Sequence, residues 1–144
     1  MKKNTRLNPE VPFFTAVVDG LPFTANQRLV EEVSLAPPLD HHYIFYGIQR
    51  EVNLEYREIR IIVPTSLEFQ AYTLGTPESK ARFEFIDNSM NVYVGIEGTI
   101  TLCESSKPEY GAVAAWFTLR AEDDGTDRSI DINGRFDMLL PLVH

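Results

Sequence analysis

Apolar residues recur at every second position over much of this chain. The segments 58–63, 82–86, 92–102 and 113–119 all show this alternation. Because successive side chains of a strand point to opposite faces, a period of two indicates strands that bury one face. Turn-forming residues separate the segments at intervals of about 8–14 residues, among them Asp19-Gly20, Gly75 and Gly125. This spacing is typical of an antiparallel sandwich or barrel.

The 144 residues suffice for one domain with an ordinary core. We therefore predict an all-β fold: a single-domain antiparallel β-sandwich or flattened barrel of about 8–10 strands. The domain is expected over residues 11–144, after a flexible leader at 1–10. At most one short helix is expected, near 26–34, where Asn26 could cap a turn containing Leu29, Val30 and Val33. A strand suits that segment nearly as well.

The stretch Asp127–Met138 has three possible interpretations. An EF-hand loop with Gly134 at its sixth position would place Leu140 where a bidentate glutamate is needed, which argues against calcium. An Asn-Gly hairpin tip at Asn133-Gly134 would pair apolar with polar residues on both faces. A continuous strand instead places Ile130, Ile132, Phe136 and Met138 on one face, so we predict a strand. Its inward glycine would mark a bulge, a bend or a close approach of another segment.

The segment 92–102 follows the same rule. Its even-numbered residues are apolar and continue through Gly98 to Leu102, which predicts a second long strand with an inward glycine. In that register Tyr93 would face away from the apolar file. Trp116, which alternates with Ala115 and Phe117, would also face away from its own apolar file.

Several short motifs, taken in order, resemble an uncharacterised family of small bacterial all-β proteins, many of them predicted lipoproteins. They are A-V-V-D-G-L-P-F-T-A, A-Y-T-L-G, E-G-T-I-T-L, A-A-W-F-T-L-R-A and I-D-I-N-G-R-F-D, which together span roughly residues 12–138. The resemblance implies a single all-β domain and no activity or site residues. This chain departs from the family in having no export signal, which puts an envelope location in doubt.

Composition narrows the possible partners. Thirteen basic against 21 acidic residues give a net charge of −8, which argues against nucleic acid and anionic membranes. Cys103 is the only cysteine, so neither an intrachain disulfide nor a cysteine-based zinc cage is possible.

No transmembrane segment is expected, because no stretch of about 20 apolar residues occurs in the sequence. The basic start lacks the apolar core of a signal peptide, so we expect a cytoplasmic protein as written, or an envelope protein if a signal was trimmed.

No catalytic motif is recognisable, and no cofactor is predicted. Asp40 and His42 could begin a metal site because they share one side of a strand, with His144 as a distant third ligand, but solvated histidines are the simpler interpretation. Cys103 has no flanking signature of a reactive thiol. We therefore predict no catalytic residues and no metal site, and an enzyme is not expected.

The aromatic residues are the remaining functional signal. If Tyr93 and Trp116 lie on the second face of the sheet, they could, with Arg120, line a site for a small apolar or sugar ligand. Partial burial of both faces would explain them equally well. The sequence thus predicts a non-enzymatic binding or protein-interaction module whose partner is unknown. The alternative is a lipocalin-like carrier of a small apolar or sugar ligand.

Overall fold

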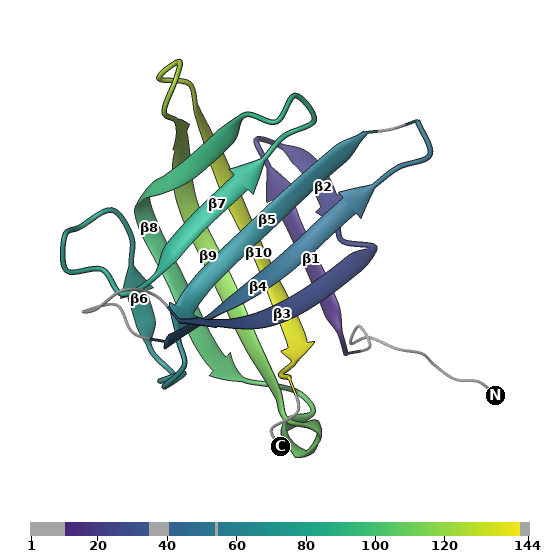
Figure 1. Ribbon diagram of the computed structural model, residues 1–144, viewed down its shortest axis with the longest axis vertical. Coiled ribbons are helices and arrows are strands. Elements are labelled where there is room, and N and C mark those ends of the chain that lie inside the picture. Colours follow the sequence, from purple (N-terminus) through teal and green to yellow (C-terminus); the bar gives the residue numbers. More distant parts are fainter. Residues whose placement is uncertain (1–10, 35–40, 54, 142–144) are drawn as a thin grey trace.

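The computed structural model describes residues 11–34, 41–53 and 55–141. They form ten strands and one short 3-10 turn, so the predicted all-β class is confirmed (Figure 1). The elements are β1 (Phe13–Val18), β2 (Leu21–Thr24), β3 (Gln27–Ser34), β4 (His41–Arg50), β5 (Tyr56–Pro64), β6 (Ala71–Thr73), β7 (Arg82–Ile86), β8 (Val92–Glu104), η1 (Pro108–Tyr110), β9 (Ala112–Asp123) and β10 (Ser129–Leu139).

All ten strands belong to one antiparallel sheet. Its order is β2-β1-β10-β9-β8-β7-β5-β4-β3, and β6 pairs with β8 beside this path. The sheet curls over on itself into a half-barrel, so β3, β4, β5 and β7 cross in front of β8, β9 and β10 (Figure 1).

The two ends of the sheet order are joined directly by the chain. β2 lies at one end and β3 at the other, although only Ala25 and Asn26 separate them. The Ala25 N–H donates to the Phe14 carbonyl of β1 at 2.9 Å, and the Asn26 N–H donates to the Ile48 carbonyl of β4 at 2.8 Å. This link therefore ties β1, near one end of the sheet order, to β4, near the other end, and helps to hold the curl.

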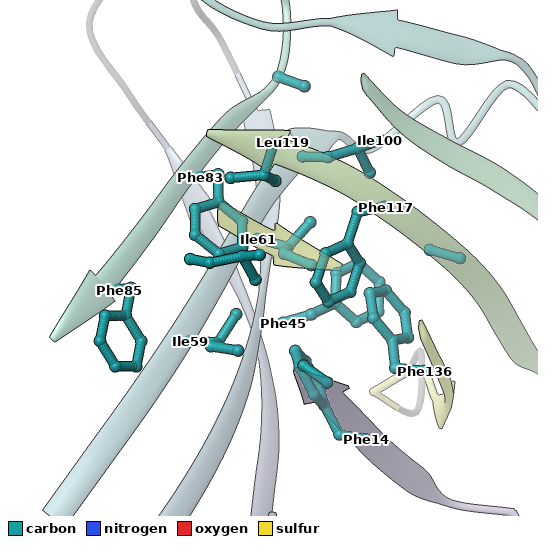
Figure 2. Packing of buried hydrophobic residues seen from close by; sticks show 14 of the residues in the cluster. Phe14, Phe45, Ile59, Ile61, Phe83, Phe85, Ile100, Phe117, Leu119 and Phe136 are labelled. Atoms are coloured by element: carbon teal, nitrogen blue, oxygen red, sulfur yellow. The ribbon is translucent and has the colours of Figure 1, made fainter. Parts of the chain in front are cut away.

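Phenylalanine rings fill the inside of the curl (Figure 2). Phe136 lies between Phe14 and Phe45, with ring centroids 5.3 and 4.7 Å away. Phe14 also contacts Phe117, which in turn contacts Phe83. Each ring comes from a different strand, so the stack ties both halves of the sheet together through burial of apolar surface.

The segment 26–34 contains the strand β3, which is the alternative to the short helix with Asn26 as its cap. Gln27–Ser34 pairs with β4 along its whole length, so its backbone groups bond to the ladder. Val30 packs against the core while Leu29 is exposed on the other face, which separates residues that a helix would group.

Within the described ranges, no helix is long and apolar enough to cross a membrane.

β10 is one continuous strand, as the parity of its apolar residues predicted. Asn133 and Gly134 pair in sequence with β9 and β1, so they are not a hairpin tip. Of the three explanations offered for the glycine, the structure supports a close approach. A Cβ at Gly134 would lie 2.5 Å from the Thr15 carbonyl oxygen and 2.6 Å from the Ala16 Cβ.

β8 corrects the predicted register of 92–102. The pairing register with β9 shifts by one residue between Gly95 and Glu97, so Ile96 is a β-bulge. The bulge changes which residues face the core, from the odd-numbered ones before it to the even-numbered ones after it. After the bulge the even residues face the core as predicted, and Gly98, at φ +114°, lies too close to Leu119 for a side chain. Before the bulge the odd residues face inward, and Tyr93 is only 2% exposed.

Candidate binding groove

Outward-facing side chains, most of them polar, form two regular rows on the outer face of the sheet, the side away from the phenylalanine rings. These side chains face outward because every second residue of β1, β9 and β10 points into the core, and the residues between them point to the opposite face. Cross-strand pairing fixes the order within each row. The first row is Thr24, Thr15, Arg135, Trp116 and Thr101; the second is Pro22, Val17, Asn133, Thr118 and Thr99.

An open groove of about 500 Å³ runs along these rows. Its walls include Thr15, Thr24, Thr118 and Asn133, which supply hydroxyl and amide groups, and it ends at Trp116. Hydroxyls and amides can donate and accept hydrogen bonds, so this lining suits a ligand that does both. The volume lies within the range of small-molecule sites.

A second hollow of about 270 Å³ lies on the other side of Trp116 and Arg135. These two residues are direct cross-strand neighbours and line both hollows, so they form the partition between them. The Trp116 side chain is 50% exposed. The Arg135 guanidinium lies 5.4 Å from the centre of the Phe13 ring. In the part of the chain that the structure describes, no carboxylate forms an ion pair with Arg135.

The second hollow also borders Cys103 and Asp137. Asp137 is buried and already engaged: it accepts hydrogen bonds from the Ser105 hydroxyl and from the Ser106 N–H, the latter at 3.0 Å. Burial, and then the nearby Asp137 carboxylate, raise the pKa of the Cys103 thiol. A raised pKa keeps the thiol protonated and therefore weakly nucleophilic.

The structure separates the three predicted ligand-binding residues. Trp116 and Arg120 lie on the outer face of β9, but Tyr93 is in the core against Phe85, with ring centroids 5.9 Å apart. The cause is the bulge at Ile96, which turns Tyr93 inward. The Arg120 guanidinium lies near carboxylates of Glu97 and Asp131, at 3.5 and 3.4 Å, and is not part of the groove lining.

Arg135 takes the place beside Trp116 that Arg120 was expected to fill. The sequence alone does not indicate Arg135, because alternation within one strand carries no information about the neighbouring strand. The pairing of β9 with β10 brings Arg135 opposite Trp116, and only that cross-strand register reveals the neighbour. The same register assembles the threonines, which are scattered along the sequence.

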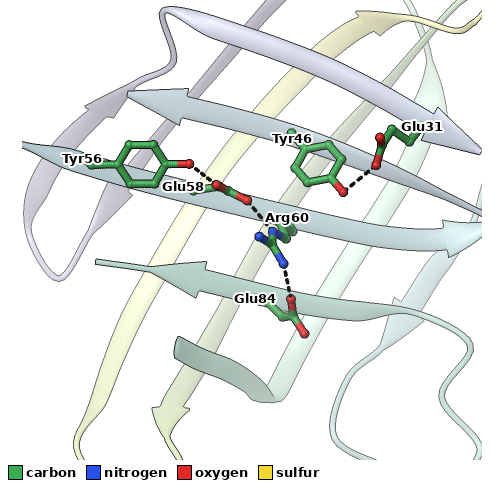
Figure 3. A network of polar contacts seen from close by, with 6 residues as sticks. All are labelled: Glu31, Tyr46, Tyr56, Glu58, Arg60 and Glu84. Carbon is green, nitrogen blue, oxygen red and sulfur yellow. Dashed lines mark hydrogen bonds and ion pairs between the residues drawn. The ribbon is translucent and has the colours of Figure 1, made fainter. Parts of the chain in front are cut away.

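A polar network occupies the outer face of β3, β4, β5 and β7 (Figure 3). Glu58 is buried there and accepts hydrogen bonds from the Tyr56 hydroxyl and from Arg60. Arg60 also lies 3.5 Å from Glu84. The Glu58 carboxylate therefore has a partner for each oxygen, which favours a structural role over an acid–base one.

Tyr46 and Glu31 extend this network. The Tyr46 hydroxyl donates to the Glu31 carboxylate at 2.7 Å, linking β4 to β3 (Figure 3). Burial, followed by this hydrogen bond, raises the pKa of Tyr46 to about 12. The phenol therefore stays protonated at neutral pH and acts as a donor.

The histidines at the start of β4 lie on opposite faces, as strand alternation predicted. The His41 Nδ1 lies 3.0 Å from the Ser34 hydroxyl, whereas His42 is buried. Asp40 and His144, the other expected members of a metal site, lie outside the described residues. Among the residues that are described, no three His, Cys, Asp or Glu side chains are grouped to hold a metal.

Comparisons of the chain with protein-family models, with curated proteins and with solved structures gave no match. The resemblance to small bacterial all-β proteins therefore stays a prediction.

Proposed function

We propose that this protein is a non-enzymatic binding module and that it holds a carbohydrate in the groove beside Trp116. The observation that carries the proposal is the Trp116–Arg135 pair, which lies between two hollows on a face that carries threonine and asparagine side chains as well as Val17 and Pro22. An aromatic surface, neutral hydrogen-bonding groups and one cation therefore lie close together on β1, β2, β9 and β10.

Sugar chemistry matches each part of that lining. The C–H face of a pyranose ring is apolar and can lie on an indole, which has an apolar body. Ring hydroxyls both donate and accept, as do the side chains of Thr15, Thr118 and Asn133 along the groove. The Arg135 guanidinium presents several N–H donors and is free of ion pairs within the described ranges.

The groove is a better candidate than the inside of the curl. A lipocalin-like carrier would hold its ligand in the lumen, but stacked phenylalanine rings occupy that space, with Phe136 only 1% exposed. The non-enzymatic part of the proposal is supported by the buried carboxylates Glu58, Asp123 and Asp137. Each of them already accepts hydrogen bonds from neighbouring groups.

Trp116 is the only tryptophan, so its fluorescence reports directly on the groove. We expect saturable quenching or a blue shift when the protein is titrated with at least one member of a panel of neutral and acidic oligosaccharides. Arg135→Ala should weaken that binding about tenfold, because a hydrogen bond from a charged donor is lost. The matched control is Arg120→Ala, two rows further along β9 on the same face, which should change the affinity less than about twofold.

Two results would contradict the groove as a binding site, and a third would change the class of ligand. One is the absence of any saturable response across the panel. The other is equal weakening by Arg135→Ala and Arg120→Ala, which would place the ligand away from the Trp116–Arg135 pair. A response to peptides but not to sugars would likewise replace the carbohydrate with a protein partner.

A further inference from the structure

A third, smaller hollow lies on the outer face of the opposite half of the sheet, far along the strand order from the groove. It encloses about 110 Å³ at one end of β3, β4 and β5. The strand register explains its apolar floor: Ile44 pairs with Ile62, and Val33 lies opposite His42. The volume is well below that of a drug-sized site, so a small ion or a terminal chemical group fits it better than a whole molecule.

His42 is the unusual member of this lining. The residue is only 6% exposed, and its Nδ1 is buried without a hydrogen-bond partner among the described residues. Its neighbour His41, by contrast, has the Ser34 hydroxyl within hydrogen-bond distance. Buried polar atoms in folded proteins are nearly always paired, so an unpaired ring nitrogen at a hollow calls for a ligand.

The charges around the hollow select the sign of that ligand. Lys80 and Arg82 are exposed members of the lining, and no carboxylate is among the described residues that line it. Arg82 pairs with Ile62, which places it on the same outer face as His42. Two carboxylates lie nearby on that face: Glu31 shares the cross-strand row of Arg82 and accepts the Tyr46 hydroxyl, and Glu84, one row further on, lies 3.5 Å from Arg60. Three nitrogen-bearing side chains thus line one hollow in a protein with a net charge of −8.

The loop before β7 is ordered by its own hydrogen bonds. The Ser79 hydroxyl donates to the Ala81 carbonyl at 2.9 Å and accepts from the Ala81 N–H at 3.3 Å. This local turn fixes the backbone on both sides of Lys80. The lysine therefore projects from a defined position at the rim of the hollow.

We propose that this hollow binds a small oxyanion, a phosphate or carboxylate group. The His42 Nδ1 has no exposed surface in this structure, so binding includes a rotation of the ring that lets Nδ1–H donate to one oxygen, while Lys80 and Arg82 neutralise the charge from the rim. The site is separate from the groove beside Trp116, so the protein would have an anion site in addition to its carbohydrate site.

The test follows the two histidine rings by long-range ¹H–¹⁵N NMR at constant pH and ionic strength. Inorganic phosphate and acetate are titrated separately, with sodium chloride as the ionic-strength control. We expect a saturable shift of the His42 Nδ1 resonance while His41 stays in place. Saturation by phosphate alone assigns a phosphate group, and saturation by acetate alone assigns a carboxylate.

Two variants distinguish anion binding in the hollow from a general effect of the protein's charge on anion affinity. Arg82→Gln should weaken binding about tenfold, because one charge-assisted hydrogen bond is lost. Arg50→Gln removes a charge at the other end of β4 and should change the affinity less than about twofold. The proposal is overturned if neither anion gives a saturable His42 shift, if both histidines shift alike, or if the two variants behave identically.

Discussion

The contact between Gly134 and β1 allows a direct test of the fold. Replacement by alanine would place a Cβ 2.5 Å from the Thr15 carbonyl oxygen and 2.8 Å from the Ala16 Cα. Both atoms are backbone, so no side chain can rotate away to relieve the overlap. To restore an ordinary van der Waals contact, β1 must retreat by roughly 1 Å, which disturbs its ladder with β10 and the packing of Phe14 behind it.

Overpacking of this kind typically costs about 1–3 kcal/mol. Because backbone must move here, we expect Gly134→Ala to lower the free energy of unfolding by about 3 kcal/mol. For a domain of this size that corresponds to a fall in Tm of about 10 °C. Urea and thermal unfolding followed by far-UV circular dichroism measure both quantities. Circular dichroism is preferable to fluorescence because Trp116 is already half exposed in the native state.

Gly125→Ala is the matched control. A Cβ there would meet nothing closer than 3.7 Å, and the residue lies in an exposed turn between β9 and β10. We expect its free energy of unfolding to stay within about 0.5 kcal/mol of the wild type. If Gly134→Ala proves as stable as Gly125→Ala, the close approach of β1 and the register of β10 are both wrong.

Two further predictions concern the core and the polar network. Phe136→Ala removes a ring from the middle of the stack and should cost about 3–5 kcal/mol in urea unfolding, whereas Leu139→Ala, on the exposed end of β10, should cost less than about 1 kcal/mol; equal losses would refute the central place of the stack. The folded pKa of Tyr46, about 12, exceeds the ordinary value of 10.0, so its contribution to stability is complete below pH 10.0 and is lost as the pH rises through 12. Glu31→Gln should lower this pKa toward 10.0 in a residue-resolved ¹³C NMR titration, and an unchanged midpoint would show that the hydrogen bond has no influence.

The alternation of apolar residues was enough to predict β10, because only one of its two faces is apolar. It was not enough for β8. Even-numbered Val92, Val94 and Ile96 indicated one register, while the apolar ring of Tyr93 fits the other equally well. The choice depends on pairing with β9, where the bulge at Ile96 absorbs one residue. Such a bulge arises from contacts distant in sequence, and local alternation does not reveal it.

The candidate groove was predicted in part, for the same reason. Trp116 was identified because its neighbours on β9 are apolar and it must face away from them. Arg135 and the threonines are adjacent to it only through cross-strand pairing. His42 shows the same limit: alternation separated it from His41, but its burial depends on β3 and on residues 79–82.

The most direct test of the carbohydrate groove is a ¹H–¹⁵N NMR titration with the oligosaccharide that perturbs Trp116 fluorescence most strongly. We expect the indole N–H of Trp116 and the Nε–H of Arg135 to shift first and to saturate together, along with backbone amides of the two polar rows on β1, β9 and β10. Shifts centred on Tyr93 in the core, or on the Glu58 network across the sheet, would contradict the groove as the binding site.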